Sequence, residues 1–345
     1  MEKSAFGITS KGEQANKYTI SNASGSKIVV TDFGATLVSV VVPDKNGKMI
    51  DVVLGYDDVS SYENNGNFCG ATVGRNCNRT EGASYRINDT LYHMDKNENG
   101  NNLHSGEANV AAKLWKVKTF ATDYITFSYH SPDGEGGFPG DFDIDVTYSL
   151  TEDNQVKIHY DGIADQDTIA NMTNHSYFNL SGHDSGNILD QTLWMDADAF
   201  TVLKTGSIAT GDIWPVEGTP MDFRVEKAIG NEIDADYEQL ILTGGYDHNY
   251  VLNKQGCGIR LIARAKSPVT GIAMECYTDT VGVQFYTGNF ISGPVGKNGV
   301  NYDVRQGFCL ETQYYPNAAN ISHFPSPILK KGKKYDSTTI YKFNK

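Results

Sequence analysis

The chain contains 345 residues, of which 39% are hydrophobic and 21% are charged. This length suffices for one large domain or two ordinary ones, and no change in composition separates two halves. The formal net charge of −13 opposes binding to polyphosphate chains and anionic lipid surfaces, so we expect neither nucleic acid nor membrane as a partner. A neutral small molecule is the better match.

The five cysteines are odd in number and widely spaced, without a Cys-x-x-Cys pair. This pattern argues against a disulfide framework and against a thiolate zinc site. The first residues lack the apolar segment of a signal peptide, and no apolar run is long enough to span a bilayer. We therefore expect a cytoplasmic protein; the alternative is a bacterial export protein whose leader is missing from the sequence.

Alternation of apolar and polar residues dominates the chain and predicts strands with one buried and one solvated face. The clearest run is Phe142–Leu150, in which every second residue is apolar. Helical periodicity is weak and short. In chain order, the expected short helices are 57–62 and 234–240, and the other expected strands are 124–130, 156–160, 258–265, 271–278 and 338–343.

Clusters of turn-forming residues separate these strands, at 43–47, 98–102, 151–154 and 296–299. Many short strands together with 35 Gly, 20 Tyr and 15 Phe predict an all-β fold, a large antiparallel β-sandwich. A parallel sheet would need crossover helices, which the sequence does not offer. We expect residues 1–345 to form a single domain.

A lone carboxylate, Glu311, lies within an apolar, strand-like run at residues 307–317. Burial of an ionised Glu is costly unless it is paired, and it raises the pKa toward the range in which the group accepts a proton at neutral pH. Glu311 is therefore a candidate general base. The alternative is a Glu on an edge strand whose carboxylate reaches solvent.

His175 lies among small polar and aromatic residues at 173–180 and is the second candidate. As an imidazolium it can protonate one oxygen while Glu311 removes a proton from another, the pair of transfers that acid–base catalysis requires. The alternative is a structural histidine beneath a loop. Three further polar stretches, at 74–79, 101–106 and 245–252, offer guanidinium, imidazole and carboxylate groups, each with an ordinary turn or loop as its alternative.

Metal and phosphate sites are not expected. The candidate ligands His104, His175, His248 and Glu311 lack the close pair spacing of common zinc motifs. The Gly-rich run at 132–140 has no Lys-Ser/Thr ending and leads into a strand, so we interpret it as a turn.

Taken together, the polar stretches resemble one family, the galactose mutarotases or aldose 1-epimerases. The matching segments follow the family's order and span nearly the whole chain. They are GRNCNR at 74–79, NNLHSG at 101–106, PDGEGGFPG at 132–140, TNHSYFNL at 173–180, YDHNYVL at 246–252, QFYTGNF at 284–290, and LETQYYPNAAN at 310–320 followed by FPSPIL.

The resemblance implies a β-sandwich of the galactose-mutarotase (supersandwich) type, and a reaction without cofactor or metal that interconverts the α and β anomers of free aldoses such as galactose and glucose. It implies His175 as the acid and Glu311 as the base, in a monomer or homodimer. The sugar-binding residues that it implies are Asn78, Arg79, His104, Tyr177, Asp247 and Gln284, with Tyr177 and Phe290 offering ring faces to the sugar. Arg75 opens the first motif, with a structural role as its alternative.

Three departures from the family pattern concern the shape of the pocket, and therefore the preferred sugar. Ser105 stands where the family usually has a second Gly. Asn76 and Cys77 replace a small apolar pair, and Asn317 replaces a common Asp. None of these changes removes a proposed catalytic group.

Three other functions remain open. A hexose-6-phosphate 1-epimerase of the same fold would need cationic residues at the pocket rim, and a non-catalytic sugar-binding module would not need both Glu311 and His175. A glycoside hydrolase would pair two carboxylates across the scissile bond, and only one emerges from the sequence.

Because the chemistry uses only side-chain protons, we predict that mutarotation persists when a chelator removes divalent ions. Polarimetry of freshly dissolved α-galactose, with and without chelator, measures this. Loss of activity that a divalent ion restores would replace the acid–base assignment with metal-assisted catalysis.

Overall fold

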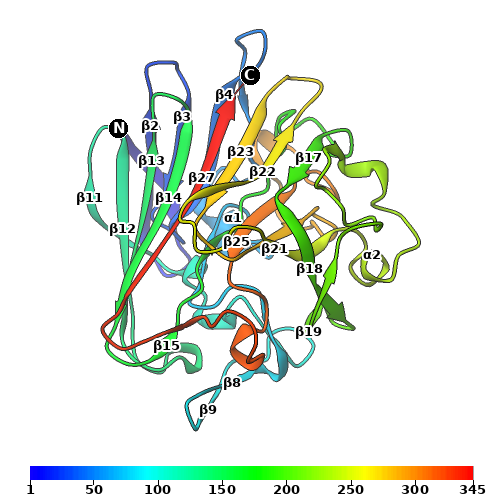
Figure 1. The fold of residues 1–345 in the computed structure, drawn as a ribbon. Helices are drawn as coiled ribbons and strands as arrows, with labels where there is room; N and C mark the ends of the chain where they lie inside the picture. The colour runs from blue at the N-terminus through cyan, green and yellow to red at the C-terminus, as the bar shows by residue number, and fades with distance from the viewer. Residues whose placement is uncertain (345) are drawn as a thin grey trace.

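The computed structural model describes residues 1–344, and its principal sheets are antiparallel, which confirms the all-β prediction (Figure 1). The largest sheet among the described residues has nine strands. Its strands, in spatial order, are β11 (Lys116–Phe120), β12 (Tyr124–Ser131), β13 (Phe142–Leu150), β14 (Gln155–Ala164), β27 (Lys334–Asn344), β23 (Ala273–Thr278), β22 (Arg260–Lys266), β17 (Thr192–Met195) and β20 (Lys227–Ala228).

One face of this sheet is buried along most of its width. Cross-strand pairing places Tyr148, Ile158, Thr339 and Thr278 in a row on that face, and all four are buried. Most residues that alternate with them are partly or fully exposed, as the apolar–polar alternation predicts, and Thr338 is a buried exception. The sheet therefore has one face available for covering by other elements.

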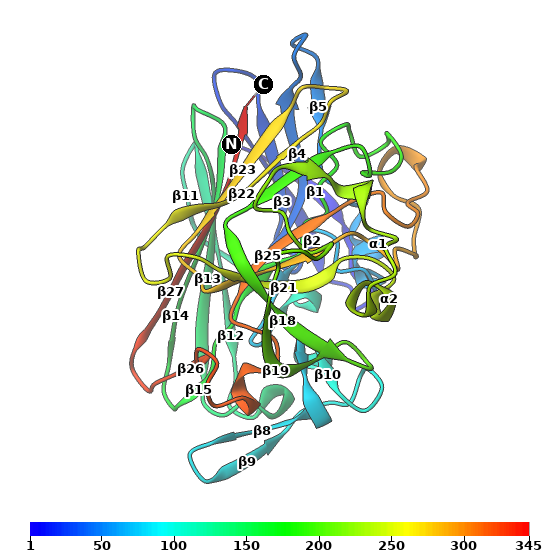
Figure 2. The same cartoon turned by 45° about the vertical axis from the view of Figure 1, so that its right-hand side comes forward.

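Two five-stranded sheets cover it at different places (Figures 1 and 2). The N-terminal sheet packs on β12 and β13, where the rings of Tyr18 and Phe127 lie 5.7 Å apart. The second sheet packs on β27, where the Tyr341 hydroxyl donates to the Leu310 carbonyl at 2.8 Å. Their strands, in spatial order, are β1 (Glu2–Ile8), β2 (Gln14–Ser21), β3 (Lys27–Thr31), β4 (Thr36–Pro43) and β5 (Met49–Asp51), then β19 (Ile208–Pro215), β18 (Ala197–Lys204), β21 (Asp247–Leu252), β24 (Gly282–Tyr286) and β25 (Cys309–Gln313).

Small elements complete the fold. Two-stranded ribbons pair β6 (Thr72–Val73) with β16 (Thr173–Asn174), β7 (Arg79–Thr80) with β10 (Asn102–Leu103), β8 (Ser84–Ile87) with β9 (Thr90–His93), and β15 (Thr168–Ile169) with β26 (Ile328–Leu329). The α-helices α1 (Val59–Glu63) and α2 (Glu238–Thr243) are shorter than the predicted segments or displaced from them by a few residues. No helix within residues 1–344 has the length and apolarity needed to cross a membrane.

The predicted strand boundaries were accurate for the longest unbroken alternation, whereas the predictions at 258–265 and 271–278 began two residues before β22 and β23. Strand β13 has the bounds predicted for it, whereas β14 continues beyond residue 160 through Gly162. A Cβ at Gly162 would lie 2.5 Å from the ring of Phe142, so this position accepts no side chain. The glycine interrupts the apolar–polar alternation at residue 162, although β14 continues to Ala164.

Strands β21, β24 and β25 separate two environments. On one face, pairing aligns Asn249, Gln284 and Glu311. On the other face, the neighbouring residues His248, Phe285 and Leu310 align and pack toward the nine-stranded sheet. One side of these strands therefore belongs to the core and the other carries a row of polar groups.

His248 is the titratable member of the core-facing row, and it gives stability a dependence on acid. The Asp247 amide donates to its Nδ1 at 3.2 Å, and burial lowers the pKa of His248 to about 3. Its neutral form therefore contributes stability that is fully present above the ordinary pKa of 6.5 and is lost as the pH falls toward the folded value.

We predict that His248→Asn reduces the acid sensitivity of the protein. Between about pH 7.5 and pH 5, the wild type should lose about 2 kcal/mol of unfolding free energy through this one group, and the variant should not. Urea unfolding at the two pH values measures the difference within each protein, so any pH-independent destabilisation by the substitution cancels. An equal acid loss in both proteins would contradict the assignment.

Candidate active site

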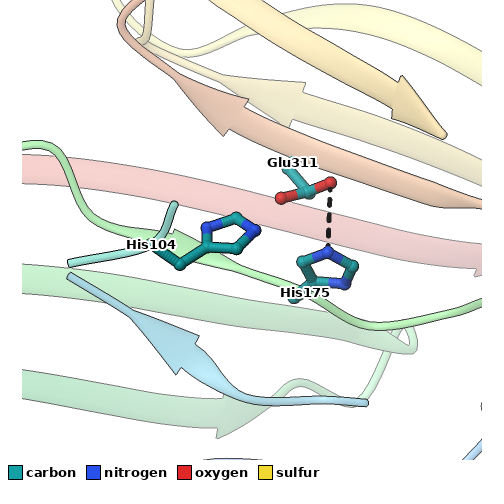
Figure 3. Close-up of side chains that lie close together, drawn as sticks. All are labelled: His104, His175 and Glu311. Atoms are coloured by element: carbon teal, nitrogen blue, oxygen red, sulfur yellow. Dashed lines mark ion pairs between the residues drawn. The ribbon is translucent and has the colours of Figure 1, made fainter. Parts of the chain in front are cut away.

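Glu311 lies at the centre of β25 with only 2% of its surface exposed. The alternative in which its carboxylate reaches solvent is therefore wrong. Its Oε1 is 3.6 Å from Nε2 of His175 (Figure 3), and its Oε2 is buried without a hydrogen-bond partner among the described residues. A carboxylate oxygen in this state is poised to accept a hydrogen bond from a ligand.

His175 follows directly after β16, and its backbone is fixed on both sides. Its amide donates to the Ala71 carbonyl at 2.9 Å, and its carbonyl accepts from the Gly70 amide at 3.0 Å. The ring is buried, with Nδ1 3.5 Å from Sγ of Cys309 and its centroid 5.0 Å from that of Tyr177. Only Nε2 is directed at Glu311.

Burial moves both groups of this pair toward their neutral forms. It raises the pKa of Glu311 well above the ordinary value, and the negative charge of Asp247 adds to this rise, while Arg79 opposes it. Burial lowers the pKa of His175 to about 4. Burial thus favours the protonated carboxyl and the neutral imidazole over the ion pair.

Arg79 is the first residue of β7, and His104 directly follows its partner strand β10. Two hydrogen bonds join Asn78 and His104. The His104 amide donates to the Asn78 carbonyl, and the Asn78 amide donates to Nδ1 of the His104 ring, each at 3.1 Å. Both residues have positive φ, near 62° and 53°. His104 is thereby held as a neutral imidazole whose Nε2 is the nitrogen left for other contacts.

A network of charges fixes Arg79. Its Nε and Nη2 donate to the two carboxylate oxygens of Glu98 at 2.7 and 2.9 Å, and its Nη1 lies 3.6 Å from Asp247. Gln284 in turn donates from Nε2 to Asp247 at 2.6 Å. A bidentate pair of this kind leaves the guanidinium little freedom to move.

These groups surround one cavity of about 170 Å³, which contains seven of the eight residues predicted for the site. The exception is Gln284, which lies behind Asp247 and is not among the lining residues. The cavity is lined by Gly66, Asn67, Phe68, Asn78, Arg79, Glu98, Leu103, His104, His175, Tyr177, Asp247, Tyr286, Phe290 and Glu311.

Several lining residues were not predicted as site residues, and the largest of them are Glu98, Phe68 and Tyr286. Tyr286 had a signal, because it is two residues from Gln284 on one strand and shares its face. The sequence around Glu98 indicated only a turn. Nothing in the sequence pointed to Phe68, whose φ is 57°. The motifs placed two carboxylates at the site, Glu311 and Asp247, and the structure adds Glu98, which also lines the cavity.

The aromatic and structural residues occupy distinct places. Phe290 lines the cavity with 64% of its surface exposed, whereas Tyr177 is buried and donates its hydroxyl to the Asn67 carbonyl. Arg75 is outside the cavity, 1% exposed, and its guanidinium donates to framework oxygens, including the Ser131 carbonyl at 2.7 Å. The structural alternative for Arg75 therefore holds.

The unusual residues of the motifs serve the backbone around the site. Ser105 Oγ accepts from the Asn76 amide and donates to the Asn76 carbonyl, each at 3.0 Å, so it ties the two loops together. The Asn317 amide donates to the Arg79 carbonyl at 2.9 Å, and its Oδ1 accepts from the Glu81 amide at 3.1 Å. Both departures support the loop that carries Arg79.

Comparison with known proteins identifies the family of the chain. The family model described as aldose 1-epimerase matches residues 16–342. The chain belongs to the aldose 1-epimerase family. This family member is 38% identical to the galactose mutarotase of Bos taurus, over 92% of this chain and 91% of that protein, and 32% identical to the aldose 1-epimerase of Escherichia coli, over 96% of each.

Solved structures of the family superpose on the chain. The aldose epimerase homologue from C. elegans has a TM-score of 0.89 at 31% identity, and the match covers 96% of this chain and 99% of that one. The galactose 1-epimerase from Lactobacillus acidophilus has a TM-score of 0.86 at 24% identity. The predicted supersandwich architecture of this aldose 1-epimerase family member is confirmed.

Proposed function

We propose that the protein is a mutarotase that interconverts the α and β anomers of free hexoses such as galactose and glucose. The observation that carries the proposal is the buried pair of Glu311 and His175, 3.6 Å apart at the wall of a cavity of hexose scale. Membership of the aldose 1-epimerase family and the named activities of the relatives support it.

In the proposed mechanism, Glu311 removes the proton of the anomeric hydroxyl while His175 protonates the ring oxygen, and the C1–O5 bond opens. Rotation about C1–C2 presents the other face of the aldehyde, and the reverse transfers close the ring. Ring opening leaves Glu311 protonated and His175 neutral, which are the forms that burial favours. Both protonation patterns contain one proton, so the cycle needs no exchange with solvent.

The remaining predicted residues are proposed to hold the sugar while its reacting end moves. Asn78, Arg79, His104 and Asp247 offer hydrogen-bonding groups at the wall, and Gln284 acts through its bond to Asp247. The rings of Tyr177 and Phe290 offer apolar surface to the C–H side of the sugar.

Two of the open alternatives are less well supported. A binding module has no need for a carboxylate and an imidazole that are both buried and both shifted toward neutrality. A glycoside hydrolase needs a second free carboxyl group, and the two other carboxylates at the wall are engaged, Glu98 by Arg79 and Asp247 by Gln284.

We also propose a reducing, cytoplasmic setting, one domain, and a monomer or homodimer. All five cysteines are free, and four of them are buried. The nine-stranded sheet contains strands from both halves of the chain, which supports a single folding unit.

We predict that Glu311→Gln and His175→Asn each reduce kcat by roughly 10²–10⁴-fold, with sugar affinity and folding largely retained. Each substitution removes the proton transfer and keeps a similar shape. Polarimetric rates, calorimetric sugar affinity and thermal midpoints measure the three effects separately. Arg79→Ala is the matched contrast and should weaken affinity as well as turnover. A near-wild-type rate for Glu311→Gln would mean that Glu311 is not the base.

A further prediction concerns substrate charge: kcat/KM should be much higher for galactose or glucose than for the 6-phosphates. Among the described lining residues, Arg79 is the one with a permanent positive charge, and Glu98 and Asp247 already balance it. A dianion would therefore meet net negative charge. A preference for the phosphorylated sugar would instead support a hexose-6-phosphate 1-epimerase.

A further inference from the structure

The ring of His175 contacts two side chains of one strand. Cys309 and Glu311 are two residues apart on β25, so their side chains share one face of the strand. Nε2 of His175 faces Glu311 Oε1 at 3.6 Å (Figure 3), and Nδ1 lies 3.5 Å from Sγ of Cys309. The carboxylate and the thiol therefore lie at the two different nitrogens of one imidazole.

The proposed mechanism specifies which nitrogen of His175 must keep its hydrogen. An imidazolium carries hydrogen on both nitrogens, and His175 gives the Nε2 proton to the ring oxygen of the sugar. The neutral ring that remains has its hydrogen on Nδ1, and Nε2 takes the proton back when the sugar ring closes. The opposite tautomer, with hydrogen on Nε2, has no lone pair there and cannot take back the proton.

The sulfur of Cys309 is placed to accept the Nδ1 hydrogen. Burial raises the pKa of the Cys309 thiol well above its ordinary value, and the negative charge of Glu311 adds to this rise, so the group is a neutral thiol. The carbonyl of His175 also favours the protonated ring, but it already accepts from the Gly70 amide at 3.0 Å. Among the described residues, Cys309 is the side chain that contacts Nδ1.

A thiol sulfur is a weak hydrogen-bond acceptor without charge. A carboxylate at the same place would stabilise the imidazolium, whereas the thiol orients the ring and leaves it a readier proton donor. Burial keeps the other titratable neighbours neutral, because it lowers the pKa of His104 and raises the pKa of both tyrosines. The titratable side chains around the ring are Cys309, Glu311, His104, Tyr177 and Tyr286.

We propose that Cys309 is a positioning residue whose sulfur accepts the Nδ1 hydrogen of His175 and so holds the neutral ring in the tautomer that leaves Nε2 free. This inference rests on the proposed function and deepens it, because the task of Nε2 comes from the mechanism. Cys309 is not among the residues that line the cavity, so it acts through His175 and not on the sugar.

Nuclear magnetic resonance of the full-length protein with ¹⁵N-labelled histidine tests the tautomer directly. Long-range ¹H–¹⁵N correlation spectra at pH 7.5 should show hydrogen on Nδ1 of His175 and none on Nε2, with the signal assigned by its absence in His175→Asn. In Cys309→Ala the neutral ring should become a mixture of both tautomers. Hydrogen on Nε2 in the wild type, or an unchanged spectrum in Cys309→Ala, would overturn the proposal.

The conservative variant Cys309→Ser separates an acceptor from a space-filling group. A hydroxyl oxygen is a stronger acceptor than a thiol sulfur, so this variant should retain the Nδ1 tautomer and raise the pKa of His175 above its wild-type value. Titration of the same ¹⁵N signals measures this shift. A pKa equal to or below the wild-type value in Cys309→Ser would count against a hydrogen bond at Nδ1.

Polarimetry supplies the kinetic test. Cys309→Ala should lower kcat by roughly 2–10-fold, the effect of one neutral hydrogen bond, and leave KM for galactose unchanged, and Cys309→Ser should recover most of the loss. Cys276→Ala is the matched control, because it removes an equally buried thiol on β23, outside the cavity lining. An equal fall in kcat in Cys276→Ala, or a raised KM in Cys309→Ala, would mean that Cys309 has only a structural role.

Two further results keep the outcomes separable. If thermal midpoints show that Cys309→Ala does not fold, the wild-type tautomer and the pKa shift in Cys309→Ser decide the question. If the spectra show the expected tautomers but the wild-type protein does not accelerate mutarotation, the hydrogen bond to Cys309 stands and the proposed function fails.

Discussion

The chemistry of the rest of the site depends on the burial of one carboxylate, that of Glu311. Glu311 is 2% exposed, and an ionised group there is stable only with compensating charge or hydrogen bonds. The positive charge of Arg79 lowers the pKa of Glu311, whereas His175, 3.6 Å away, is itself shifted toward its neutral form. Burial therefore favours the proton on Glu311 over the proton on His175, so ring opening, which leaves Glu311 protonated and His175 neutral, ends in the favoured forms.

The position of the Glu311 carboxylate in the cavity depends on the register of strand pairing. Glu311 faces the cavity because β25 pairs with β24 in the register that aligns it with Gln284. A shift of one residue would exchange it with Leu310 and place the carboxylate against the packed sheets. The Tyr341 hydroxyl, which donates to the Leu310 carbonyl, and the contact of Thr312 with Thr339 hold this register from the core side.

Sequence alone predicted what depends on local pattern. Unbroken alternation gave both ends of β13, whereas the apolar run around Glu311 left open a buried and a solvent-exposed carboxylate, and the structure shows the buried one. Contacts between segments that lie far apart in the sequence could not be predicted from local pattern. Glu98 reaches Arg79 from a turn, and the amide of Gln284 donates to Asp247 on a neighbouring strand. Such pairings depend on how loops are placed by distant strands, which local periodicity does not encode.

The same distinction applies to charge. Net charge alone suggested a neutral ligand, but a single local arginine can recruit a phosphate in an acidic protein. The structure removes that possibility for Arg79 in a specific way, because Glu98 occupies two of its donors and Asp247 lies beside the third nitrogen. The guanidinium is thereby held as a rigid hydrogen-bonding wall with its charge balanced. That is what recognition of uncharged hydroxyls requires, and it follows from the placement of Glu98 and not from the composition of the chain.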